Sequence, residues 1–330
     1  MLRYEVVGVY ARAYDAPRGF LGIAIRGALG SALYNIYCVN PGLECSKCSR
    51  YEECPYARLY ESTPRLDPAP SIARKLGAVT NPFTIDVLYS TERGLGYAVN
   101  LFGDATRYVK EVLVAVLTAS AQGIGYSLRM AERRRLRVER ITQVEPGSGR
   151  STPVYEGGVL HPERIPRRPP RSLLAVFARE AMGLGEKAPG MLELEFLSPY
   201  RVGDGFKPSF RAVLMNIARR YSLLAQYHRA GRPLSLRDAR GLARLASTVE
   251  LVSARHGRLV EVTKRSLVSG ERLSYGLFAE GGVLLYRLPR GFWGSPYSRL
   301  AAALLLAGRY LHVGKLASAG YGRYVLRAYG

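Results

Sequence analysis

The stretch that decides the fold is Val313-Gly-Lys-Leu-Ala-Ser-Ala-Gly-Tyr-Gly-Arg-Tyr-Val-Leu-Arg-Ala-Tyr329, at the end of the chain. It joins a glycine-punctuated loop to an alternating strand. Glycine adopts positive φ and lets the backbone approach a ligand closely, so consecutive loop amides can form an anion-binding nest. The alternative is a tight connection that only needs small residues. The residues predicted to contact a phosphate backbone are Gly314, Lys315, Ser318, Gly320, Gly322 and Arg323.

The composition favours a nucleic-acid partner. The 330 residues include 48 Lys and Arg against 26 Asp and Glu, a net charge of +22. Only 7 are Lys, which leaves 48 − 7 = 41 Arg. Arginine binds phosphate bidentately and stacks on bases, although an arginine bias also reflects GC-rich or thermophilic genomes. The length is about twice that of a typical domain, so we expect two domains.

The composition also argues against a membrane protein. Arg3, Glu5 and Arg12 interrupt any apolar run at the start of the chain, so no signal peptide is predicted. The uncharged apolar stretches are far shorter than the roughly 20 residues that span a bilayer. We therefore expect a cytoplasmic protein with no membrane partner.

Two halves of the chain predict the same order of elements. The first half is expected to hold strand 2–13, helix 19–37, strands 82–90 and 95–103, helix 104–121 and a long strand 126–143. The second half is expected to hold strand 191–200, helix 207–229, an inserted helix 236–254, strands 258–268 and 272–288, helix 296–309 and strand 322–329. Both orders read βαββαβ. The sequence therefore predicts an α+β protein of two tandem ferredoxin-like domains, 1–145 and 191–330, joined by a Pro- and Arg-rich linker or hairpin at 146–190.

Several motifs in this order resemble a known family. They are Gly22-Ile-Ala-Ile-Arg-Gly-Ala-Leu-Gly30, Cys54-Pro-Tyr56, Pro82-Phe83, Ser198-Pro-Tyr-Arg201, Arg219-Arg220, Lys264-Arg-Ser266 and the terminal glycine loop. Together they resemble the CRISPR-associated repeat-processing endoribonucleases of the RAMP superfamily, over nearly the whole chain. The resemblance implies two ferredoxin-like domains that bind CRISPR repeat RNA. It also implies metal-independent cleavage that leaves a 2′,3′-cyclic phosphate.

All four cysteines lie in one short segment, as Cys38-x6-Cys45-x2-Cys48-x5-Cys54. A Cys-x2-Cys knuckle with two flanking thiolates suits tetrahedral zinc, and such sites stabilise the fold directly. An iron–sulfur cluster also fits the spacing, and two disulfides fit a hyperthermophile. Four thiolates leave no open coordination position, so any metal here is expected to be structural and not catalytic.

A second basic cluster lies on the expected strand 126–143. Alternation would place Arg133, Arg135 and Arg137 on one face, where they could follow a phosphate backbone. The alternative is a solvated edge strand whose charges prevent aggregation.

Catalytic residues are harder to identify. Cleavage through the RNA's own 2′-hydroxyl needs a base, an acid and stabilisation of the phosphorane. The resemblance implies a histidine on or just after the first helix, but no histidine precedes His161. Tyr34 and Lys47 lie in that region, and His312 lies beside the glycine loop, so these three are the catalytic candidates. The alternative function is a non-catalytic RAMP-type RNA-binding subunit of a CRISPR effector complex, with other effector subunits as partners.

Overall fold

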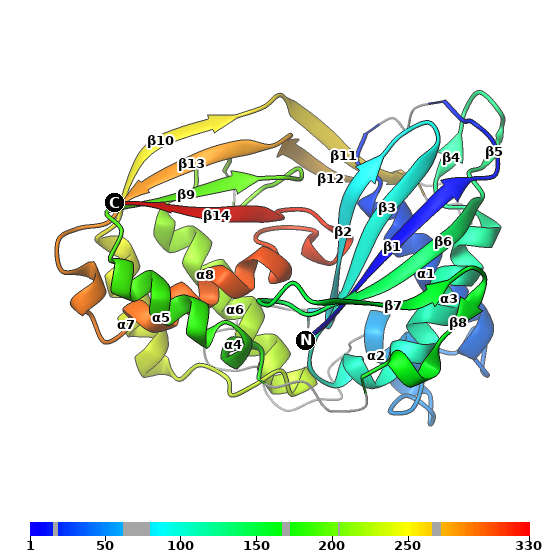
Figure 1. The fold of residues 1–330 in the computed structure, drawn as a ribbon, viewed down its shortest axis with the longest axis horizontal. Helices are drawn as coiled ribbons and strands as arrows, with labels where there is room; N and C mark the ends of the chain where they lie inside the picture. The colour runs from blue at the N-terminus through cyan, green and yellow to red at the C-terminus, as the bar shows by residue number, and fades with distance from the viewer. Residues whose placement is uncertain (16–18, 62–79, 167–171, 204, 266–271) are drawn as a thin grey trace. The chain divides into compact units, whose positions relative to one another are not determined.

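The structure is a computed structural model that describes residues 1–15, 19–61, 80–166, 172–203, 205–265 and 272–330 (Figure 1). The chain forms two compact units. Unit 1 comprises Met1–Val176 with Ser222–Pro233, and unit 2 comprises Phe177–Tyr221 with Leu234–Gly330. Within the described parts, no helix is both long enough and apolar enough to span a membrane. The expected boundaries after residues 145 and 190 stay a prediction.

Unit 1 contains an antiparallel sheet in the order β2-β3-β1-β6-β7-β8, and Figure 1 shows these strands side by side. The strands are β1 (Leu2–Tyr10), β2 (Phe83–Ser90), β3 (Gly94–Leu101), β6 (Leu136–Val144), β7 (Ser151–Glu156) and β8 (Val159–Leu160). The first strand lies between the third and fourth strands of the βαββαβ order, with β7 and β8 extending the edge. The expected ferredoxin-like arrangement is therefore present in this unit.

Helices α1 (Gly22–Tyr37) and α3 (Val109–Gln122) pack against each other in unit 1. Alternate residues of β1, namely Leu2, Tyr4 and Val6, are buried in one apolar core with both helices. This alternation is what a strand with one covered face requires. The remaining short helices are η1 (Cys45–Lys47), α2 (Pro55–Tyr60), η3 (Gly103–Tyr108), η4 (Pro162–Arg164) and α4 (Leu173–Val176).

Unit 2 contains a second antiparallel sheet in the order β10-β13-β9-β14. Its strands are β9 (Met191–Phe196), β10 (Glu250–His256), β13 (Gly282–Arg287) and β14 (Tyr324–Tyr329). Again the first strand lies between the third and the fourth. The helices of this unit are α5 (Ala178–Lys187), α6 (Phe210–His228, whose last residues count with unit 1), α7 (Leu236–Ser247), α8 (Ser298–Leu311), η5 (Phe292–Gly294) and η6 (Ala317–Ala319). Both antiparallel sheets with covering helices confirm the α+β class.

Three predicted elements of the second half are wrong in detail. The expected helix 236–254 ends at Ser247, and its last part is the sheet strand β10. The expected strands at 258–268 and 272–288 are instead a separate two-stranded hairpin, β11 (Leu259–Arg265) with β12 (Arg272–Ala279), followed by β13. Most side chains of β10 are exposed, so this edge strand lacks the apolar alternation by which a strand is recognised.

The long basic strand expected at 126–143 is also divided. Residues Tyr126–Ser127 (β4) and Glu132–Arg133 (β5) form a small hairpin, and only β6 joins the sheet. Part of the expected linker at 146–190 continues the sheet as β7 and β8, and another part forms α4 and α5. Residues 62–79, 167–171 and 266–271, which include three of the linker arginines and Ser266, lie outside the described residues.

Candidate nucleic-acid interface

The glycine loop connects α8 to β14 and is mostly buried in unit 2. A Cβ atom at Gly314 would lie 2.1 Å from the carbonyl oxygen of Arg201, and one at Gly322 would lie 1.8 Å from that of Val313. Both glycines also have positive φ, 92° and 72°. These two positions therefore need glycine because the loop packs closely on its own protein.

Four N–H groups of the loop donate hydrogen bonds to protein acceptors. They belong to Gly314, Lys315, Gly320 and Gly322, and their acceptors, in that order, are Asn216 Oδ1 (2.8 Å) and the carbonyl oxygens of Arg201 (3.1 Å), Ala317 (3.0 Å) and Pro199 (2.9 Å). An N–H group that is already paired inside the protein does not offer itself to a phosphate. The expected anion nest is therefore wrong for these four amides.

The backbone amides of the loop are paired, but some of its side chains reach the surface. Lys315 is exposed, while Ser318 and Arg323 are half-buried. RNA contact by the loop stays a prediction, and it now depends on these side chains. Two side chains accept hydrogen bonds from the loop backbone. Asn216 Oδ1 accepts from the Gly314 N–H, and Ser198 Oγ accepts from the Arg323 N–H at 2.9 Å.

His312, a catalytic candidate, is fully buried at the end of α8. Its φ is +62°, and its Nδ1 lies 3.0 Å from the carbonyl oxygen of Ala317. The ring thus bridges the two ends of the tight turn that opens the glycine loop. In this position it has no exposed atom to present to an RNA.

The other two catalytic candidates belong to unit 1 and lie near one segment. Tyr34, on α1, accepts a hydrogen bond at its hydroxyl from the Gly42 N–H at 3.2 Å, and its ring meets Tyr56 edge to face at 5.1 Å between centroids. Lys47 lies in η1 and is exposed, and its Nζ lies 2.9 Å from a carboxylate oxygen of Glu44. The structure therefore brings Tyr34 and the cysteine segment that carries Lys47 together.

Arg133, Arg135 and Arg137 are all exposed, but they do not lie on one strand, because Arg133 is in β5 and only Arg137 is in β6. Arg137 faces Glu139 at 3.5 Å, and both side chains are open to solvent, so this ion pair is weak. Arg134, between them, is buried and pairs with Asp15 at 3.3 Å. The run thus divides into three exposed cations and one structural arginine.

Helix α7 carries a stripe of exposed arginines that the sequence reading missed. Arg237, Arg240 and Arg244 are spaced by three and four residues, so they share one helix face. None of the three has an ion pair or hydrogen bond at its side chain within the described ranges. We call these three residues the α7 arginine stripe. The signal that could have found it is the spacing of basic residues opposite the apolar face of an inserted helix.

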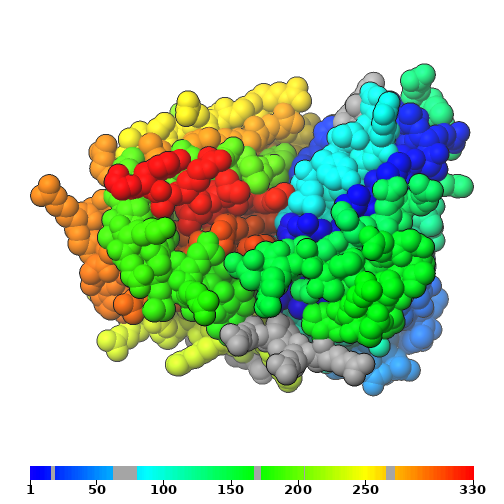
Figure 2. Space-filling view, in the orientation of Figure 1, coloured from blue at the N-terminus to red at the C-terminus, as the bar shows by residue number. Residues whose placement is uncertain are grey.

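Many other surface arginines of unit 2 are compensated. Arg258, Arg272 and Arg287 lie 2.6, 3.6 and 2.9 Å from carboxylate oxygens of glutamates. On the open face of the second sheet, Arg327 pairs with Glu193 at 2.9 Å and with Glu195 at 2.5 Å. Figure 2 shows β14, in red, on the surface. Its outer face therefore holds paired charges, unlike the α7 arginine stripe.

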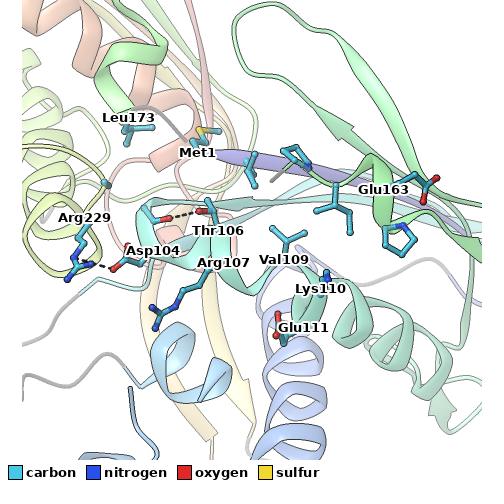
Figure 3. A pocket seen from close by; sticks show the side chains of 16 residues that line it. Met1, Asp104, Thr106, Arg107, Val109, Lys110, Glu111, Glu163, Leu173 and Arg229 are labelled. Carbon is cyan, nitrogen blue, oxygen red and sulfur yellow. Dashed lines mark hydrogen bonds and ion pairs between the residues drawn. The ribbon is translucent and has the colours of Figure 1, made fainter. Parts of the chain in front are cut away.

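A pocket of about 870 Å³ lies in unit 1 between η3, η4 and the start of β1 (Figure 3). Its charged lining residues are Arg107, Lys110, Arg229, Asp104, Glu111 and Glu163. Asp104 lies 3.7 Å from Arg229. Three cations face three carboxylates, so this pocket does not have the charge that a polyanion requires.

The four cysteines of unit 1 are free thiols that line one cavity of about 340 Å³. Burial raises the pKa of Cys45 to about 11, with smaller contributions from Glu61 and from the other three cysteines. Within the described residues, no group of three or more His, Cys, Asp or Glu side chains is close enough together, as placed, to hold a metal ion.

The fold and the loop first define a class of protein: two ferredoxin-like modules with a glycine loop before the last strand. In fold, the chain is similar to the product complex of Cas6 (TTHB231), with 15% identity, a TM-score of 0.55 and coverage of 99% of this chain and 100% of that chain. It is also similar to Thermus thermophilus Cas6 (TTHB231), with 15% identity, a TM-score of 0.50 and coverage of 99% and 98%. No curated protein matches the chain.

The family follows from the sequence matches. Residues 1–169 match the family model AF_1859_N, described as an N-terminal domain. Residues 194–324 match the family model of the CRISPR-associated endoribonuclease Cas6. Residues 194–324 therefore form a domain of the CRISPR-associated endoribonuclease Cas6 type, which confirms the resemblance drawn from the motifs.

Proposed function

We propose that this protein is an endoribonuclease that binds CRISPR repeat RNA and cuts it to process precursor CRISPR RNA. The observation that carries the proposal is the Cas6 family match over residues 194–324, which includes the glycine loop. The charge of +22 and the uncompensated arginines supply the attraction for a polyanion. A CRISPR transcript as substrate implies a cytoplasmic location.

The proposed reaction uses the RNA itself as nucleophile and needs no metal. A base removes the proton of a 2′-hydroxyl, whose oxygen attacks the adjacent phosphorus. The bond to the 5′-oxygen breaks, that oxygen takes up a proton, and the products are a 2′,3′-cyclic phosphate and a 5′-hydroxyl. A large part of the rate enhancement is expected from holding the 2′-oxygen in line with the scissile bond.

We assign the chemistry to residues of unit 1. The half-buried Tyr34 has a phenolic O–H, a proton donor that is suited to protonate the leaving 5′-oxygen. The exposed ammonium of Lys47 is suited to stabilise the phosphorane, because its pair with Glu44 is solvent-screened and readily exchanged. His312 is buried, and in this proposal it stabilises the conformation of the glycine loop and takes no part in catalysis.

We assign RNA binding to three groups of cations that are exposed, or half-buried in the case of Arg323. They are Lys315 and Arg323 of the glycine loop with Ser318 beside them, the run Arg133, Arg135 and Arg137, and the α7 arginine stripe. Phosphate contacts position a nucleic acid without selecting its bases. Base selection is therefore expected from other contacts with the repeat.

The test is incubation of the full chain with a labelled repeat RNA in a buffer without magnesium that contains EDTA. The expected result is one specific cut, absent when the nucleotide upstream of the cut carries a 2′-deoxy substitution. The 3′ end of the upstream product is expected to accept a ligated label only after the cyclic phosphate has been opened and the phosphate removed. Tyr34→Phe is expected to slow single-turnover cleavage by about 100-fold or more, with unchanged RNA affinity. A cut that persists in the 2′-deoxy RNA overturns the mechanism.

A second candidate function is a non-catalytic RAMP-type subunit that holds the repeat within a CRISPR effector complex. Two observations favour it: no histidine precedes His161, and His312 is buried. Tight binding of the repeat without any cut, in single-turnover conditions, would support this candidate and contradict the first. Association with other effector subunits stays a prediction.

A further inference from the structure

The segment from Cys38 to Cys54 has almost no apolar core of its own. Tyr51 is its only buried residue, while Val39 and Leu43 expose 63% and 48% of their surface. Its regular structure is the single short helix η1. A segment that buries so little apolar surface gains little free energy from folding, and such segments are usually held by a disulfide or a metal.

The four cysteines of this segment lie on the side that faces a cavity. All four are half-buried, and they line the same cavity, together with Tyr37 and Pro55. Because all four are free thiols, no disulfide holds the segment. The lining of the cavity of about 340 Å³ therefore includes cysteines from both ends and the middle of the segment.

Each cysteine also lies at the end of a local structure. Cys38 caps the C-terminus of α1, and Cys54 precedes Pro55 at the N-terminus of α2. Cys45 begins η1, and the Cys48 N–H donates to its carbonyl oxygen at 3.2 Å, which makes a Cys-x2-Cys turn. The backbone positions of the four thiols are thus set by hydrogen-bonded turns.

The sulfur of Cys48 has a polar neighbour of its own. Asn40 Nδ2 donates to Cys48 Sγ at 3.4 Å. An N–H donor stabilises a sulfur that carries negative charge, and a hydrogen-bonded neighbour of this kind often orients a metal ligand. Arg50, Glu53 and Glu111 also line the cavity, and Arg50 pairs with Glu53 at 3.0 Å, so these side chains add no net positive charge beside the thiols.

We propose that Cys38, Cys45, Cys48 and Cys54 bind one zinc ion as thiolates. The reaction is balanced as four thiols plus Zn²⁺ giving a zinc tetrathiolate and four protons. The Cys-x2-Cys turn with two flanking cysteines is typical of structural zinc sites, and the iron and sulfide content tests the iron–sulfur alternative. As placed, no three of the sulfurs converge, so binding requires rotation of the side chains into the cavity.

The zinc ion would take no part in the proposed reaction itself. Four thiolates fill a tetrahedral shell, so the ion has no open position for water or phosphate. Its role is to fix the segment that carries Lys47 and contacts Tyr34 through Gly42. Failure of the zinc proposal is read from metal content, whereas failure of the proposed function is read from RNA cleavage.

The experiment measures zinc, iron and acid-labile sulfide in the full chain purified without chelator. The expected result is about one zinc per chain with neither iron nor sulfide. Titration of the apo-protein with Co²⁺ is expected to give the thiolate charge-transfer and ligand-field absorption of a tetrahedral site. Iron with equimolar sulfide, disulfides found by mass spectrometry, or no bound metal would each overturn the proposal.

Variants sharpen the result. Cys45→Ser and Cys48→Ser are each expected to bind zinc at least ten times more weakly than the wild-type chain. The matched control is Ser49→Ala, an exposed position in the same segment, which is expected to keep its zinc. If a cysteine variant does not fold, the Co²⁺ titration of the wild-type chain decides the question. Zinc that is retained in both cysteine variants contradicts the proposal.

Discussion

Each ferredoxin-like module has an insertion after its first helix, and the two insertions are stabilised in different ways. In unit 2, α7 buries Ala239, Leu242 and Ala246 on one face and begins with a capping box between Ser235 and Asp238. In unit 1, the segment Cys38–Cys54 buries only Tyr51 and has no such face. The same position in the fold therefore accepts an amphipathic helix, which supplies its own packing, or a short segment that relies on its cysteines.

The largest expected difference between the two insertions follows metal removal. A ligand at 1,000 times its dissociation constant stabilises the state that binds it by about 4 kcal/mol. Stripping the metal with a strong chelator is therefore expected to increase amide hydrogen exchange across residues 38–54 by a factor of about 1,000, with no change across α7. Hydrogen-exchange mass spectrometry measures both regions in one sample. An equal response of the two insertions would contradict the comparison.

The next largest effect concerns the apolar face of α7. Leu242 is fully buried, so Leu242→Ala is expected to lower the free energy of unfolding by about 2–5 kcal/mol. The control is Leu236→Ala on the same helix, where 49% of the side chain is exposed and the change is expected to stay within about 0.5 kcal/mol. Denaturant unfolding gives both values. Equal values for the two variants would show that packing does not hold α7.

The exposed face of α7 gives a third test, in RNA binding. Replacing Arg237, Arg240 and Arg244 together by alanine is expected to reduce the slope of log affinity against log salt by about 2, at roughly 0.7 per phosphate contact. The matched control replaces Arg258, Arg272 and Arg287, which removes the same charge from glutamate-paired arginines. A salt titration of repeat RNA binding compares them. Equal slopes in the two triple variants would mean that only net charge matters.

The same salt titration also tests the glycine loop as an RNA contact. Lys315→Ala with Arg323→Ala is expected to reduce the same slope by about 1.4, and to weaken all RNA sequences alike, because phosphate contacts do not select bases. The measurement uses the repeat and a scrambled RNA of the same length. Unchanged affinity for both RNAs would exclude the loop as a contact site.

The smallest effect concerns the start of α7. Ser235 Oγ accepts from the Asp238 N–H at 3.1 Å, while the Asp238 carboxylate accepts from the Ser235 N–H at 3.0 Å. Ser235→Ala removes one side of this box and is expected to lower the free energy of unfolding by about 1 kcal/mol. Thermal or denaturant unfolding detects the change. Ser235→Asn can still cap the helix, so it is expected to keep most of the free energy of unfolding that Ser235→Ala loses.

Much of the fold was predictable because it is encoded in local periodicity. The strands that alternate buried and exposed residues, such as β1 and β9, and the helices α1, α6 and α8 lie close to their expected ranges. Strand β10 was missed because an exposed edge strand has no apolar period, and the hairpin β11–β12 was then taken for sheet strands.

The candidate site was predictable only in part. The glycine loop was found from its spacing, but the use of its amides depends on Asn216, Pro199 and Arg201, which lie about 100 residues away in the sequence. Whether an arginine is paired depends in the same way on distant residues, as Arg327 with Glu193 shows. The apolar neighbours of His312, such as Leu311 and Val313, are typical of a packed histidine, and the structure does bury it.

By itself, the sequence determined the duplicated βαββαβ order, the strong positive charge and the grouping of four cysteines, since each is a property of local pattern or composition. Only the tertiary structure decided which strands join each sheet, which loop amides are already occupied and which arginines have no carboxylate partner. The physical reason is that hydrogen bonds and ion pairs form between groups brought together by folding. The sequence shows which charged and hydrogen-bonding groups are present, and the folded structure determines which of them pair.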